Sequence, residues 1–146
     1  MSEMLNNVNM VFLDTAPVIY YVEKKQPYFD QVKQFFDLLD AGEVTAVSSP
    51  ITLAESLFYP YKQGNKEVIN AFRALLTHGP HTQFVPVTAP IAELSANLRA
   101  QHNLGFADAI QVAVAINAGC DALLTNDKKL RRITELNVIV LGDEAN

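Results

Sequence analysis

Short apolar runs alternate along the chain with longer segments in which apolar residues recur at helical spacing. The short runs are typical of β-strands buried on both faces, and they occupy residues 8–13, 44–47, 84–87, 121–125 and 138–141. The longer segments predict helices at residues 15–22, 28–39, 50–64, 66–76, 89–101 and 106–116, with a short basic helix at 128–133. Strands that alternate with helices indicate an α/β fold with a parallel sheet and right-handed crossovers. The tail GDEAN is expected to be loose.

The stretch at residues 105–127 organises the rest of the chain. Its first part is apolar on nearly every side, so the helix at 106–116 should be buried. Gly119 suits the left-handed conformation that often ends a helix, and the following DALLT segment suits a buried parallel strand. Asp108 lies in the first turn of the helix, and Asp127 comes just after the strand. An acid in the first turn of a buried helix, together with an acid just after the next strand, suggests a metal site.

Two further acids occupy comparable positions. Asp14 comes directly after the strand at residues 8–13. Glu55 lies at helical spacing from Ile51 and Phe58, with Ala54 beside it, so we expect it on the apolar face of its helix. An unpaired carboxylate on such a face costs desolvation free energy. Each acid also has a structural interpretation, since the aspartates can cap helices and Glu55 can face the solvent.

The carboxyl ends of parallel strands are where ligands bind in open α/β sheets, and these acids could meet there. The set is Asp14, Glu55, Asp108 and Asp127. Carboxylates without cysteine or paired histidine form a hard oxygen site, which favours Mg²⁺ or Mn²⁺ over Zn²⁺. Such an ion polarises a phosphoryl oxygen and lowers the pKa of bound water. The chain has no Walker loop and no GxGxxG sequence.

Segments spread over almost the whole chain resemble the PIN-domain ribonucleases, most of all the VapC toxins of toxin–antitoxin pairs. They are FLDTAPVIYYVE, LAES, LRAQHNLGFADAIQVAVA and LLTND, in family order and at family spacing. The resemblance implies a single-domain, three-layer α/β/α fold with a central parallel sheet in the order 3-2-1-4-5. It assigns the metal-binding, catalytic acids to Asp14, Glu55, Asp108 and Asp127. It gives supporting roles to Thr15, Thr125 and Asn126.

The chain departs from the family pattern at two places. Ala16 stands where the family often has Asn or Ser, and its side chain cannot form a hydrogen bond. Lys129 stands where many members carry another acid. The main acids are all present, but a second metal ion is less certain to bind.

The implied reaction is metal-dependent hydrolysis of RNA by activated water. RNA would approach along basic residues whose alternative is a solvated helix face, namely Arg99, Lys128, Lys129, Arg131 and Arg132. The resemblance also implies an antitoxin partner and a homodimer. Aromatic residues that could form a groove for a partner helix, or lie in the core, are Tyr20, Tyr21, Tyr28, Phe35, Phe36, Phe58, Tyr59 and Tyr61.

Composition narrows the class of protein further. The 146 residues are 49% hydrophobic and 18% charged, as expected for one globular domain spanning residues 1–146. The net charge of −5 argues against a general nucleic-acid coat. A single cysteine, no signal peptide and no transmembrane stretch favour a cytoplasmic protein that does not enter a membrane. His78, His81 and His102 share no ligand spacing and are predicted to lie on the surface.

Other functions remain open from the residues alone. A phosphatase of the haloacid-dehalogenase type also begins with a strand that ends in Asp, but it needs a second Asp where Ala16 stands. A receiver-like domain would pair two acids early in the chain, where only Asp14 is found. A PIN-like module could also bind RNA or protein without catalysis, which the intact acids argue against.

Overall fold

The strands of the computed structural model form one parallel sheet in the order β3-β2-β1-β4-β5, as predicted. The structure describes residues 1–142, so residues 143–146 of the tail lie outside it. The strands are β1 (Met10–Leu13), β2 (Thr45–Ser48), β3 (Thr82–Phe84), β4 (Ala122–Thr125) and β5 (Asn137–Val140). The helices are α1 (Thr15–Val22), α2 (Phe29–Asp40), α3 (Pro50–Gln63), α4 (Lys66–His78), α5 (Ala89–His102) and α6 (Phe106–Asn117), with a 3₁₀-helix η1 (Lys128–Arg132).

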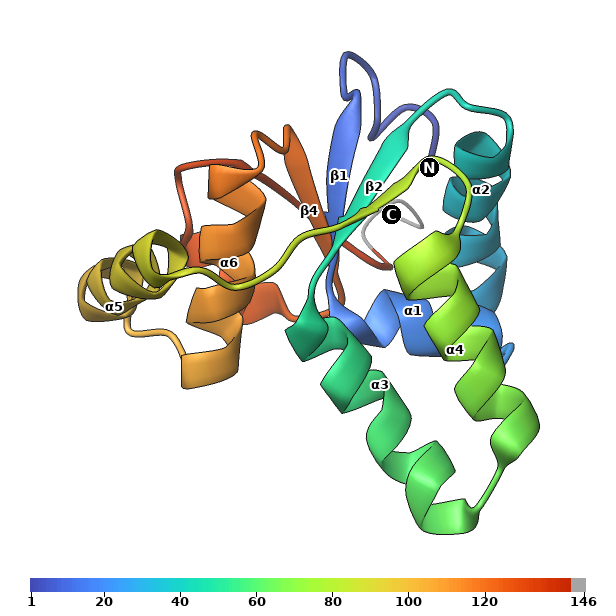
Figure 1. Ribbon diagram of the computed structural model, residues 1–146. Coiled ribbons are helices and arrows are strands. Elements are labelled where there is room, and N and C mark those ends of the chain that lie inside the picture. Colours follow the sequence, from blue (N-terminus) through green and yellow to red (C-terminus); the bar gives the residue numbers. More distant parts are fainter. Residues whose placement is uncertain (143–146) are drawn as a thin grey trace.

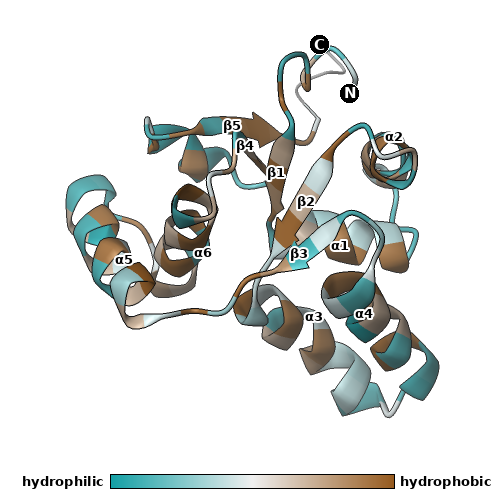
Figure 2. Cartoon of the chain, turned by 45° about the horizontal axis from the view of Figure 1, so that its top comes forward, coloured by the Kyte–Doolittle hydropathy of each residue, from teal (hydrophilic) through white to brown (hydrophobic). Residues whose placement is uncertain are grey.

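The helices cover both faces of the sheet, which confirms the three-layer α/β/α architecture (Figure 1). Helices α1 to α4 lie on one side and α5 and α6 on the other. Alternation along β1 shows why: Val11 and Leu13 belong to the core under α1 to α4, whereas Phe12 belongs to the core under α5 and α6. Figure 2 shows the hydrophobic strands between the two helical layers.

Helix α6 is buried along most of its length, as its apolar sequence predicts. Residues 109–115 are all buried, and Gly119 ends the segment with a φ of +79°. Among residues 1–142, no helix combines the length and the apolar character that a transmembrane span requires.

The prediction for the third strand was displaced along the chain. We expected residues 84–87, but β3 is Thr82–Phe84, and it does lie at an edge of the sheet. Val85 still donates its N–H to the carbonyl of Ser48 at 2.9 Å. Pro86 follows and has no N–H to donate, so the ladder ends there.

The buried face of α3 also differs from the prediction. We expected Ile51, Ala54 and Phe58 to share an apolar inner face with Glu55, but Phe58 is 61% exposed and Glu55 faces the solvent. The residues that α3 buries are instead Thr52, Ser56 and Pro60. These are small side chains at every fourth position, and they let α3 pack closely against the molecule. Glu55 therefore avoids the desolvation cost that the sequence pattern implied.

Candidate active site

Asp14 lies at the carboxyl end of the central strand and is held on both of its carboxylate oxygens. Its Oδ1 accepts the N–H of Thr15 at 2.9 Å, and its Oδ2 accepts the hydroxyl of Thr125 at 2.7 Å. Asp14 also caps the start of α1, which is the structural role that the sequence allowed for it. Burial raises the pKa of Asp14, the two hydrogen bonds lower it, and the charges of Glu55 and Asp127 raise it further. The side chain is fixed in one orientation at the edge where ligands bind.

Thr125 connects the ends of two neighbouring strands. Strands β1 and β4 are paired, and the N–H of Asp14 donates to the carbonyl of Leu124 at 3.0 Å. Besides donating to Asp14, the Thr125 hydroxyl oxygen accepts the N–H of Asp127 at 3.0 Å. Asp127 in turn caps η1, where its Oδ1 accepts the N–H of Lys129 at 2.9 Å. One buried hydroxyl thus sets the geometry of two acids.

Glu55 and Asn126 are tied to helix α1. The hydroxyl of Thr15 donates to Glu55 Oε1 at 2.6 Å, which brings α3 to the start of α1. Asn126 donates its Nδ2 to the hydroxyl of Tyr20 at 2.6 Å. Sequence reasoning missed this role of Tyr20, because nothing in a single aromatic residue shows which distant side chain it contacts.

Asp108 lies within electrostatic reach of the other three acids. Its pKa is raised to about 6 by burial and then by the charges of Asp14, Asp127 and Glu55, while the ammonium of Lys129 lowers it. All three other acids therefore act on Asp108 electrostatically. The starts of α1, α3 and α6 lie together at the lower end of the sheet in the view of Figure 1.

A cavity of about 330 Å³ opens beside Asp108 and Asp127. Its lining also includes Gly105, Lys129 and Arg132. The cavity is thus lined by both acidic and basic residues, which suits a phosphate diester held against a cation. Lys129 replaces the extra acid of the family pattern, and it supplies positive charge at this place.

Arg132 has a structural role that the sequence did not show. Its Nη1 donates to the backbone carbonyls of His102 at 3.4 Å and Asn103 at 3.1 Å, at the end of α5. Arg132 therefore helps to join η1 to the segment that precedes α6, and it still lines the cavity.

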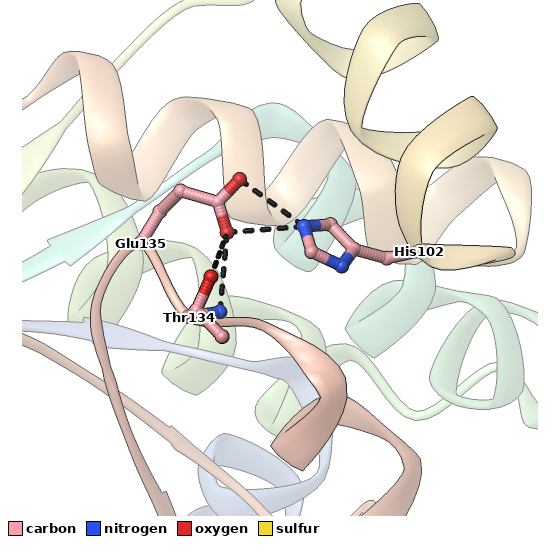
Figure 3. A network of polar contacts seen from close by, with 3 residues as sticks. All are labelled: His102, Thr134 and Glu135. Carbon is pink, nitrogen blue, oxygen red and sulfur yellow. Dashed lines mark hydrogen bonds and ion pairs between the residues drawn. The ribbon is translucent and has the colours of Figure 1, made fainter.

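A second contact joins the end of α5 to the segment that follows η1 (Figure 3). His102 Nε2 lies 3.0 and 3.1 Å from the carboxylate oxygens of Glu135, which also accepts from the backbone and hydroxyl of Thr134. This interaction lowers the pKa of Glu135. His102 was predicted to lie on the surface but is largely covered, with 15% of its side chain exposed, whereas His78 and His81 are exposed as expected.

The remaining basic residues that we predicted to contact RNA are exposed, and they lie on two elements. Lys128 and Arg131 belong to η1, next to the acidic edge. Arg99 lies on α5 and lines a largely apolar cavity of about 490 Å³ between α5 and α6.

The donor chemistry fits a hard divalent cation. All four side chains offer carboxylate oxygens, and their mutual repulsion at Asp108 is what a bound cation would relieve. Among residues 1–142, however, no three His, Cys, Asp or Glu side chains are arranged to hold a metal ion by themselves. Mg²⁺ commonly keeps several waters and takes one or two carboxylates plus substrate phosphates, so an open set of this kind is compatible with it. The assignment of the metal ligands stays a prediction.

Comparison with known proteins gives a family and several similar folds. The sequence matches the PIN domain family over residues 11–136. No curated protein sequence matches it significantly. The VapBC2 complex from Rickettsia felis, solved with a promoter DNA fragment, has a TM-score of 0.72 at 23% identity, covering 90% of this chain and 98% of that chain. A toxin–antitoxin complex from Klebsiella pneumoniae has a TM-score of 0.69 at 23% identity, covering 89% and 96%. VapC20 of Mycobacterium tuberculosis, described as a toxin that cleaves the sarcin–ricin loop, has a TM-score of 0.63 at 18% identity, covering 77% and 86%.

Proposed function

The chain belongs to the PIN-domain family, and we propose that it is a divalent-metal-dependent ribonuclease that hydrolyses RNA phosphodiester bonds. The observation that carries the proposal is the hydrogen bonding that holds Asp14, Glu55 and Asp127 at one edge of the sheet. Burial, and then the charges of these three acids, raise the pKa of Asp108 to about 6. Carboxylates that repel one another at a ligand-binding edge are a typical feature of a catalytic or metal site. The matched family and the similar folds support the same assignment.

In this proposal each acid has a distinct task. Asp14 is the most firmly oriented ligand, because Thr125 and the N–H of Thr15 hold both of its oxygens. Glu55 and Asp127 complete the oxygen donors from α3 and from the end of β4. Burial and the neighbouring acids raise the pKa of Asp108 to about 6, so a bound cation would favour its ionised form. A bound Mg²⁺ or Mn²⁺ would polarise the scissile phosphate and lower the pKa of a water molecule.

The substrate would reach these acids through the cavity that basic residues also line. Lys129 lines the same cavity as Asp108 and Asp127, where it can contact a phosphate group. Lys128 and Arg131 extend this positive charge along η1. Arg132 is committed to carbonyl groups at the end of α5, so we assign it mainly to support of the cavity wall.

We also propose that the protein is the toxin of a toxin–antitoxin pair and forms a homodimer. An exposed aromatic surface on α3 supports a protein partner: Phe58, Tyr59 and Tyr61 are each at least 60% exposed. A shallow cavity of about 560 Å³ lies along this surface, lined by Ala54, Leu57, Phe58, Tyr61 and Lys62. The other aromatic residues of the predicted groove belong to the core: Phe35 and Phe36 are buried, and Tyr20, Tyr21 and Tyr28 are partly buried against it. An amphipathic helix with an apolar face is the partner that such a surface fits.

Membership of the PIN-domain family removes the phosphatase and receiver alternatives. A PIN-like module that binds RNA without cleaving it is the remaining alternative. Lys129 stands where many family members carry an acid, and this difference is the reason to test the binding alternative.

Cleavage of total cellular RNA by the purified protein tests the proposal. We expect cleavage with Mg²⁺ or Mn²⁺ and none with excess chelator. Asp14→Asn keeps the size of the side chain but removes its charge, and it should lower the rate on the order of 10²-fold or more. Asp30→Asn, an exposed first-turn acid on α2, is the matched control and should cleave normally. Cleavage that persists in chelator or in Asp14→Asn would refute the proposal.

A further inference from the structure

A chain of buried polar side chains joins the three elements that carry Asp14, Glu55 and Asp108. It consists of Ser49, Thr52 and Gln111, whose exposed fractions are 0%, 0% and 2%. The Ser49 hydroxyl donates to Gln111 Oε1, and Gln111 Nε2 donates to the Thr52 hydroxyl oxygen at 2.6 Å. The Thr52 hydroxyl then donates to the backbone carbonyl of Leu13 at 3.3 Å. The hydrogen bonds thus run in one direction from α3 to α6, back to α3, and on to β1.

Three members of this chain of hydrogen bonds lie close in the sequence to an acid of the site. Leu13 immediately precedes Asp14 in the sequence. Thr52 is one helical turn before Glu55 on α3, and Gln111 is one turn after Asp108 on α6. A change in the separation of Gln111 and Thr52 would therefore change the separation of the acids that their helices carry.

This chain of buried hydrogen bonds stabilises the fold only when every polar group in it has a partner. It therefore favours one placement of the helices that carry these groups. Gln111 is a long polar residue among apolar neighbours in the most buried helix of the fold. A buried amide that loses its partners pays a desolvation penalty, whereas an apolar residue in its place would only need to fill the space. Ser49 is also anchored, because its Oγ accepts the N–H groups of Ile51 and Thr52 and caps α3. The observed arrangement of α3, α6 and β1 satisfies these groups, and a shift of one element would break a buried hydrogen bond.

From this geometry we propose that Thr52 and Gln111 are positioning residues that set the spacing of Asp14, Glu55 and Asp108 for metal binding and catalysis. The proposal rests on the ribonuclease function proposed above. Neither side chain needs to contact the metal or the RNA. Misplacement of a catalytic group by about 1 Å can lower a rate on the order of 10²-fold, so small shifts of these helices would be measurable.

The test compares Thr52→Val and Gln111→Leu with a control that loses a similar buried hydroxyl. Ser48→Ala is that control: Ser48 is 0% exposed, and its hydroxyl donates to the carbonyl of Leu76 on α4 at 3.0 Å, outside the polar chain. For each variant we would measure the melting temperature, the affinity for Mn²⁺ by calorimetry, and kcat and KM for RNA cleavage. Thr52→Ser restores the hydroxyl and serves as the conservative rescue.

All three disruptive variants should melt at lower temperature than the wild type. Only Thr52→Val and Gln111→Leu should bind Mn²⁺ about tenfold more weakly and lose kcat by about 10- to 100-fold, with KM little changed. Thr52→Ser should return Mn²⁺ affinity and kcat close to wild type. If Gln111→Leu does not fold, Thr52→Val and Thr52→Ser decide the question.

Two negative outcomes are distinguishable. If wild type binds Mn²⁺ and cleaves RNA, and Thr52→Val behaves like Ser48→Ala, the positioning role is refuted while the ribonuclease function stands. If wild type neither binds Mn²⁺ nor cleaves RNA, both proposals are refuted together.

Discussion

Replacement of Asp108 by asparagine should stabilise the folded protein at neutral pH while it removes activity. The folded-state pKa of Asp108 is raised from 3.8 to about 6 by burial and by the neighbouring acids. An acid whose folded pKa exceeds its unfolded pKa binds more protons in the folded state, so its contribution to stability falls as the pH rises between these two values. Above about pH 6 the ionised carboxylate opposes folding. Asparagine has nearly the same shape and no charge.

The magnitude follows from the shift and from two corrections. At about 1.4 kcal/mol per pKa unit, the full shift would correspond to about 3 kcal/mol. Asp108 is only half-buried, so solvent screening reduces this to about 1–2 kcal/mol. Loss of a negative charge from the first turn of α6 costs roughly 0.3–1 kcal/mol through the helix dipole. The net stabilisation at pH 7 therefore lies between about 0 and 1.7 kcal/mol, with a midpoint of about 0.9 kcal/mol, or up to a few degrees in melting temperature.

The assay is thermal and urea unfolding of wild type and Asp108→Asn in chelator, at pH 4 and pH 7 and at low salt. The difference between the two proteins should be present at pH 7 and small at pH 4, where wild-type Asp108 is protonated. Glu67→Gln is the matched control, because Glu67 is an exposed first-turn acid on α4 and should show only the loss of the dipole interaction. Saturating Mn²⁺, at about 100 times its Kd, should stabilise wild type by about 2.7 kcal/mol. Asp108→Asn should respond far less to Mn²⁺.

The reasoning is refuted if Asp108→Asn is no more stable than Glu67→Gln at pH 7 in chelator. It is also refuted if the difference from wild type is the same at both pH values. Either result would mean that Asp108 acts as a helix-terminal charge, and that the neighbouring acids do not destabilise it.

Three further predictions concern the strand edge, the RNA and the partner. Thr125→Val removes a hydrogen bond that lowers the pKa of Asp14, so the acidic limb of the pH–rate profile should move to higher pH, whereas Thr125→Ser should restore it. Substitution of Lys128 and Arg131 by alanine should weaken RNA binding for all sequences alike and reduce its salt dependence by roughly 0.7–1 unit of slope for each lost phosphate contact; an unchanged slope would show that η1 is only a solvated helix. Phe58→Ser should abolish co-purification with a co-expressed antitoxin from an adjoining reading frame while RNA cleavage is kept, and retention of the complex would place the partner elsewhere.

Local patterns in the sequence were sufficient for most of the architecture. The run ending at Leu13 and the DALLT segment could be identified as buried strands because apolar runs of that length need a covered sheet. Helix α6 could be identified as buried because a helix that is apolar all round has no side suited to water. The sheet order came from the resemblance of the acidic segments to the PIN-domain family, and the structure confirms it. The positions of Asp14 and Asp127 after their strands follow from the same local pattern.

The contacts between polar side chains were decided only by tertiary structure. Hydrophobic spacing placed Glu55 on an inner face, but α3 turns Thr52 inward instead, because the Thr52 hydroxyl finds Gln111 and the Leu13 carbonyl there. The bond between Ser49 and Gln111 spans 62 positions of the chain, and no local rule relates residues so far apart. The spacing of apolar residues along a helix or strand indicates which of its sides is buried. Which donor meets which acceptor inside depends on how the finished layers pack, since a buried polar group is stable only where its partner has been brought to it.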